Sequence, residues 1–78
     1  MQLKPLKLNE IVKSARLGKE MTQKQAAKEL NITPQYYHDI ETGRRAPTFY
    51  KTVRKLSQFT GLSERDILYL AVFRKEIK

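Results

Sequence analysis

The chain has 78 residues, with sixteen Lys plus Arg against eight Asp plus Glu, one His and no Cys. This length suits one domain and is too short for two, and the lack of cysteine excludes disulfides, thiolate metal sites and cysteine nucleophiles. No apolar run approaches the ~18 residues of a membrane span, and no apolar segment follows the basic N-terminus as in a signal peptide. We therefore expect a single cytoplasmic domain at residues 1–78 with no membrane association.

A formal net charge of +8 and an isoelectric point near 10.0 favour a polyanionic partner, most simply nucleic acid. The positive excess is concentrated in residues 1–60, whereas residues 61–78 are nearly balanced in charge and rich in aliphatic and aromatic side chains. This asymmetry suggests that one region faces a polyanion and the C-terminal region faces protein. The alternative for any single lysine is that it only solubilises a small domain.

The first half of the chain predicts two short helices. The first lies near residues 9–18, where apolar side chains recur on one helical face at Leu8, Ile11, Val12 and Ala15. The second covers residues 23–30, with Thr22 as its N-cap and with Ala26, Ala27 and Leu30 facing inward. Two small alanines let another helix approach closely.

A third helix is predicted at residues 34–42. Thr33 can cap it, Pro34 suits the first helical position because a missing N–H is no loss there, and Gly43 suits the C-terminal cap. Only two or three residues separate this helix from the preceding one. So tight a bend is typical of a helix-turn-helix, here at about residues 22–43.

The remaining sequence predicts two more helices. Pro47-Thr48 opens the fourth, which places Phe49, Val53 and Leu56 on one inward face and closes before Gly61. Ser63 and Asp66 form a capping-box-like pair that starts a fifth helix at about residues 64–76. Its apolar stripe contains Ile67, Leu70 and Ala71, with Arg74 at its end. Since no segment alternates with the period of a strand, we expect an all-α, compact five-helix bundle.

The stretch from Thr22 to Pro47, TQKQAAKELNITPQYYHDIETGRRAP, resembles the Cro/C1-type (XRE) helix-turn-helix family of phage repressors and bacterial regulators. It is most similar to the branch whose third helix follows the pattern S/T-P-x-Y-L-S-x-I-E-x-G-R-R-x-P. The resemblance extends from about Leu8 to Leu70. It implies a lambda-repressor-like DNA-binding domain.

The helix at residues 34–42 has two distinct sides. Tyr37 and Ile40 face inward, whereas the outer face is polar and contains Gln35, Tyr36, His38, Asp39 and Thr42. Such a face fits a major groove about 12 Å wide, and the amide of Gln35 matches the N6 and N7 atoms of adenine. Asp39 either accepts from cytosine N4 or repels phosphate and excludes wrong sequences. A merely solvated polar face is the alternative, which we rank below DNA contact in a domain of charge +8.

Four residues around this helix are candidates for phosphate contact. The resemblance implies one at Gln23, where backbone N–H groups of the helix start add positive potential. Thr33 can cap its helix, contact a phosphate, or do both. Arg44 and Arg45 suit phosphate oxygens because they are always charged and donate several N–H groups, although arginine pairs also occur in plain surface loops.

Two further positions carry a structural expectation from the resemblance. An Arg in the first helix often pairs with the Glu of the I-E-x-G motif in this family, which implies an internal ion pair between Arg16 and Glu41. The chain also departs from the family pattern twice. Pro34 replaces a base-contacting Gln of some relatives, and Tyr37 replaces a Leu or Ile, so its hydroxyl needs a partner.

The leading functional hypothesis is a sequence-specific transcriptional regulator of double-stranded DNA, a repressor that acts as a homodimer on a pseudo-palindromic operator. Tyr69, Phe73 and Ile77 are the dimer candidates, whereas Ile67 and Leu70 are expected to complete the monomer core. The alternative is an antitoxin or protein-interaction module whose C-terminal helix binds a partner protein. No enzyme motif, cofactor, metal site or small-molecule ligand is predicted, because His38 stands alone and no phosphate-binding glycine-rich loop is present.

Overall fold

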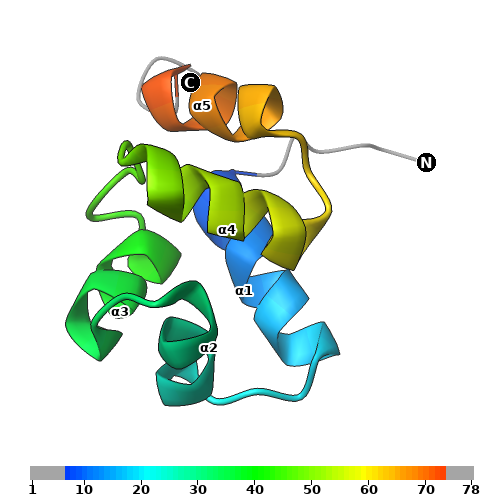
Figure 1. Cartoon of the computed structure of the whole chain (residues 1–78), viewed down its shortest axis with the longest axis vertical. Coiled ribbons are helices and arrows are strands. Elements are labelled where there is room, and N and C mark those ends of the chain that lie inside the picture. The colour runs from blue at the N-terminus through cyan, green and yellow to red at the C-terminus, as the bar shows by residue number, and fades with distance from the viewer. Residues whose placement is uncertain (1–6, 74–78) are drawn as a thin grey trace.

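A computed structural model describes residues 7–73, the last of them by its backbone alone, and they form five α-helices and no strand (Figure 1). The helices are α1 (Leu8–Gly18), α2 (Gln23–Leu30), α3 (Pro34–Thr42), α4 (Tyr50–Thr60) and α5 (Glu64–Phe73). The all-α, five-helix prediction is confirmed. Within the described range no helix is both long enough and apolar enough to cross a bilayer.

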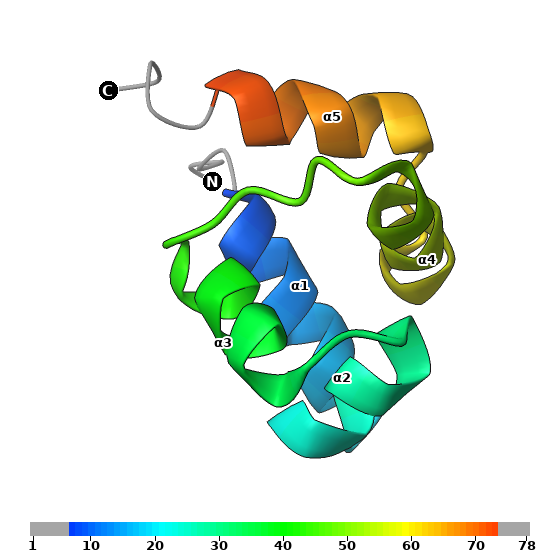
Figure 2. The same cartoon turned by 60° about the vertical axis from the view of Figure 1, so that its left-hand side comes forward.

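Helix α1 is the centre of the arrangement, and it contacts α3, α4 and α5. Helices α2 and α3 pack against each other at one end of the molecule, and α5 lies at the other end in both views (Figures 1 and 2). Helix α4 packs against α1, α2 and α5 and so connects the two ends. The helix-turn-helix is therefore supported from behind by α1 and α4.

The predicted helix ends are present. The Thr22 hydroxyl accepts a hydrogen bond from the Gln25 backbone N–H at 3.1 Å, and the Gln25 side chain accepts in turn from the Thr22 N–H at 2.8 Å. The Thr33 hydroxyl caps α3 by accepting from the Tyr36 N–H at 3.1 Å, and Pro34 occupies the first turn. Gly43 closes α3 in the left-handed conformation, at a φ of 85° that a residue with a Cβ adopts only under strain.

The core is formed by apolar side chains from all five helices. It comprises Leu8, Val12, Ala26, Ala27, Leu30, Tyr37, Ile40, Val53, Leu56, Phe59, Ile67 and Ala71. Burial of Ala26 and Ala27 lets the backbone of α2 lie close to its neighbours, as the sequence predicted. Ile67 is fully buried and Leu70 packs against the core, so both help to complete it.

The prediction for the start of the fourth helix was wrong. Helix α4 begins at Tyr50, and the segment before it is non-helical, with Phe49 at a φ of −70° and a ψ of 132°. Pro47 is buried in the irregular connection that precedes the helix. Phe49 therefore remains 70% exposed, whereas Val53 and Leu56 are buried as predicted. The predicted extension of the fifth helix over residues 74–76, with Arg74, lies outside the described residues.

Substitutions at Leu56 and Phe49 test directly which of these side chains belongs to the core. Leu56→Ala should lower the free energy of unfolding by about 2–5 kcal/mol, because it leaves a cavity among buried side chains. Phe49→Ala should change it by no more than about 0.5 kcal/mol, because the ring is mostly in solvent. Urea denaturation followed by circular dichroism measures both. A comparable loss in the two variants would contradict the placement of Phe49.

Candidate nucleic-acid interface

The orientation of α3 is set by the buried carboxylate of Glu41. Its Oε2 accepts from Arg16 Nε at 2.8 Å and from the Tyr37 hydroxyl at 2.6 Å. Its Oε1 accepts from Arg16 Nη2 at 3.1 Å and from Gln23 Nε2 at 2.8 Å. Arg16 also donates to the backbone oxygen of Met21 at 2.9 Å. The ion pair predicted between Arg16 and Glu41 is thus present, and it joins α1, α2 and α3.

Glu41 and its donors Arg16, Gln23 and Tyr37 are called the Glu41 cluster below. This cluster also supplies the hydrogen-bond partner that the Tyr37 hydroxyl needs. The phenol is fully buried, and its hydroxyl donates to the Glu41 carboxylate, which supplies the partner that a buried Tyr requires. Burial by itself raises the pKa of Glu41, but the hydrogen bonds from Arg16, Tyr37 and Gln23 outweigh it and hold that pKa below its ordinary value of 4.5. Burial and the neighbouring carboxylate raise the pKa of Tyr37 far above its ordinary value. At neutral pH the pair is therefore a carboxylate and a neutral phenol.

On the outer side of α3, Gln35 is exposed to solvent, whereas Asp39 is almost completely buried. Gln35 Nε2 donates to Asp39 Oδ1 at 3.0 Å, and Arg45 Nε lies 3.5 Å from Asp39 Oδ2. Asp39 is only 8% exposed, so its carboxylate is enclosed between these two neighbours. The Arg45 guanidinium also lies 5.8 Å from the centroid of the Tyr36 ring. The fold therefore brings four of the predicted DNA-contacting residues into one connected group.

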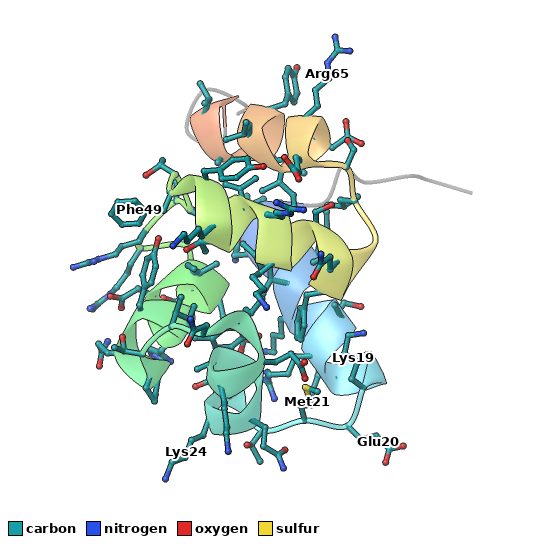
Figure 3. All side chains as sticks on the ribbon, in the orientation of Figure 1. Lys19, Glu20, Met21, Lys24, Phe49 and Arg65 are labelled. Atoms are coloured by element: carbon teal, nitrogen blue, oxygen red, sulfur yellow. The ribbon has the colours of Figure 1, made fainter. Side chains whose placement is uncertain are left out.

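A hollow of about 500 Å³ lies beside the start of α3. Its lining includes four of the sequence-predicted contact residues, Thr33, Tyr36, Arg44 and Arg45, together with Ala46, Thr48 and Phe49. Phe49 projects outward on the α3 side of the molecule in Figure 3. Sequence reasoning missed Thr48 and Phe49, because it assigned both to a helix. The available signal was the position of Phe49 two residues after Pro47, in a basic loop.

The other predicted contact residues have local partners. Gln23 is partly buried, and its Oε1 lies 3.2 Å from Nδ1 of the exposed His38, so its side chain belongs to the Glu41 cluster as well as to the start of α2. The Thr42 hydroxyl is exposed and donates to the His38 backbone oxygen at 2.9 Å. Their contacts with DNA stay predictions.

The outward side of α5 exposes apolar as well as charged side chains. Leu68, Tyr69 and Val72 are 43%, 57% and 62% exposed. Tyr69 was a predicted dimer residue, whereas Leu68 and Val72 were missed although the inward side of α5 was predicted correctly. The Phe73 side chain and Ile77, the two other candidates, lie outside the described residues.

Three comparisons relate this geometry to known proteins. Residues 12–67 match the model of the helix-turn-helix family. The "Endothelial differentiation-related factor 1 homolog" of Xenopus laevis is 34% identical over 61 residues, which cover 78% of this chain and 41% of that protein, so the chain spans about two fifths of the length of this curated relative. The crystal structure of the clp gene regulator ClgR from C. glutamicum has the same fold, with a TM-score of 0.60 at 23% identity over 96% of this chain and 100% of that chain.

The Glu41 cluster predicts a specific dependence of stability on pH. Because the pKa of Glu41 is lowered by folding, its contribution is present above the pKa of the unfolded chain and is lost as the pH falls through the folded value. Glu41→Gln should lower the free energy of unfolding by about 3–5 kcal/mol at neutral pH. The difference in this free energy between the variant and the wild type should become smaller below about pH 4. Urea denaturation at a series of pH values measures this difference.

Glu29→Gln is the matched control, because Glu29 is an exposed acid on α2 and should change neither stability nor its pH profile appreciably. If Glu41→Gln proves too unstable to measure, Tyr37→Phe removes one donor and keeps the ion pair, at a cost of about 1.5–3 kcal/mol. A constant gap between Glu41→Gln and the wild type across the acidic range would contradict the assignment.

Proposed function

The chain belongs to the helix-turn-helix family, and from this membership we propose that it is a transcriptional regulator that binds double-stranded DNA. The observation that supports this most is the surface of α3, where the exposed amide of Gln35 lies beside a hollow lined by Arg44 and Arg45. This arrangement supports DNA binding, because a side chain that can hydrogen-bond to base edges lies near cations that can contact phosphates. The net charge of +8 adds long-range attraction to the same partner.

The proposed binding mode places α3 in the major groove. Gln35, in the first turn of α3, pairs with an adenine, and Tyr36 and Thr42 border the same groove. Arg44 and Arg45 contact the DNA backbone from the loop after α3. Thr33 and Gln23 lie at helix starts, where backbone N–H groups favour a phosphate.

We further propose that the regulator acts as a homodimer and represses by occluding a promoter. The exposed apolar side chains of α5 supply a surface for a second copy, and α5 lies away from α2 and α3 in Figures 1 and 2. A second copy on α5 would leave α3 uncovered. Two copies related by a two-fold axis match an operator with half-sites one turn, ~34 Å, apart.

The exposed side of α5 also supports a second candidate function. An antitoxin or interaction module would use Leu68, Tyr69 and Val72 to bind another protein, with DNA as a secondary partner. Co-purification of a small protein in a one-to-one ratio from the native host would favour this candidate. Its loss on changing Val72 to Asp would place the contact on α5.

Selection of bound sites from random duplex DNA tests the proposed function most directly. A defined motif is expected, and two inverted copies of it would give the symmetry of the bound dimer. Recovery of no enriched sequence would contradict sequence-specific binding.

Arg44→Ala should weaken binding to all DNA sequences alike and reduce the slope of log affinity against log salt concentration by about one, because one phosphate contact is lost. Fluorescence anisotropy over a salt series measures both effects. Arg65→Ala is the matched control, since Arg65 lies on α5 at the far end of the molecule from α2 (Figure 3). Equal effects of the two substitutions would indicate general charge attraction rather than a contact at Arg44.

Val72→Asp should convert the dimer into a monomer, because it places a charge among the exposed apolar side chains of α5. Sedimentation at micromolar concentration, with and without the selected duplex, measures the oligomeric state. Lys51→Gln, at an exposed position on α4, is the control because it lowers the net charge by the same one unit. A wild-type protein that stays monomeric in both conditions would rule out the homodimer.

A further inference from the structure

We propose that Asp39 is a positioning residue, which holds the Gln35 amide in the one orientation that prefers adenine over guanine. The inference rests on the proposed function, because it assigns the base preference of the same α3 surface. It gives Asp39 a different role from a direct contact with DNA.

The hydrogen bond between the two side chains selects one amide orientation. Gln35 and Asp39 are four residues apart, so they lie on one side of α3, and Nε2 donates to Oδ1 over 3.0 Å. A carboxylate only accepts hydrogen bonds, so it must face the NH2 end of the amide. Rotating the amide by half a turn would place Oε1 against the carboxylate oxygen, and two acceptors repel each other.

Asp39 can impose this choice because it is itself held in place. Its other carboxylate oxygen lies 3.5 Å from Arg45 Nε, and the residue is 8% exposed. Its backbone oxygen accepts from the N–H groups of Arg44 at 2.8 Å and Arg45 at 3.2 Å, which folds the loop after α3 back over it. The Arg45 side chain is in turn placed against the Tyr36 ring. The carboxylate therefore has a fixed position from which to orient Gln35.

The groups that remain on Gln35 match one purine. Its amide has two N–H donors and one oxygen acceptor, and Asp39 uses one of the donors. Within residues 7–73 the Gln35 side chain makes no other hydrogen bond, so one N–H and Oε1 remain for a base. Adenine offers an acceptor at N7 and a donor at N6 in the major groove, whereas guanine offers acceptors at N7 and O6. An amide held by Asp39 therefore pairs with adenine and would oppose its oxygen to O6 of guanine.

The geometry also argues against direct base contact by Asp39. Gln35 and Arg45 each face one carboxylate oxygen, and Asp39 is nearly buried whereas Gln35 is exposed. Each oxygen could accept a further hydrogen bond, but a direct contact with cytosine N4 would require this nearly buried carboxylate to become exposed. The two roles predict changes at different base pairs, which makes them separable.

The test measures the ratio of affinities for two duplexes. The first is the site that the wild-type protein selects from random DNA, and the second differs by one A·T to G·C change at the pair whose preference Gln35→Ala abolishes. The wild type is expected to prefer the adenine duplex by about 5- to 150-fold. Asp39→Asn should lower this ratio several-fold, because its amide can accept from or donate to Gln35 and so permits a second orientation, in which the Gln35 NH2 group can face guanine O6. Competition binding gives the ratio independently of overall affinity.

Asp66→Asn on α5 is the matched control, because it removes the same charge from an exposed position and should leave the ratio unchanged. An unchanged ratio in Asp39→Asn, or a preference altered at another base pair, would overturn the inference while leaving the proposed function intact. A wild type that prefers no duplex would overturn both. If circular dichroism shows that Asp39→Asn is unfolded, Arg45→Ala decides the question. Releasing Asp39 in that variant should also lower the ratio, and an unchanged ratio would overturn the inference.

Discussion

One buried carboxylate determines the arrangement of the helix-turn-helix. Glu41 receives hydrogen bonds from Arg16 on α1, from Gln23 on α2 and from Tyr37 on its own helix. Such a charge is stable in the interior only because all of its donors are present, so the relative placement of the three helices is fixed together with the carboxylate. The small apolar core alone would constrain these angles less, because dispersion contacts have no comparable directionality.

Two side-chain hydrogen bonds within α3 each join residues that are four positions apart, one on each side of the helix. On the inner side the Tyr37 hydroxyl donates to Glu41, which attaches the helix to the core. On the outer side the Gln35 amide donates to Asp39, which orders a side chain at the surface. Since both pairs belong to one rigid helix of nine residues, the order at the surface depends on the anchoring behind it. The polar residues of α3 are therefore organised in two layers.

The sequence predicted most of the fold because its signals are local. Thr22, Thr33 and Gly43 determine helix ends through contacts with residues a few positions away, and all three were identified correctly. Phe49 was misplaced because its environment depends on the path imposed by the buried Pro47, which a helical periodicity cannot anticipate. The enclosure of Asp39 was equally out of reach, since it requires the loop after Gly43 to turn back and bring Arg45 beside the carboxylate. The pairing of Arg16 with Glu41 came from the family resemblance rather than from spacing alone.

The small number of exposed apolar side chains on the described part of α5 bears on how the protein would respond to its own concentration. Leu68, Tyr69 and Val72 offer few side chains, whereas stable protein interfaces bury about 1,200–2,000 Å². A pairing through these three side chains alone would therefore be weak, and most copies would be single at low concentration. When two weakly paired copies are needed to occupy one operator, occupancy rises with roughly the square of concentration. A short apolar stripe would in that way make regulation respond to small changes in expression level.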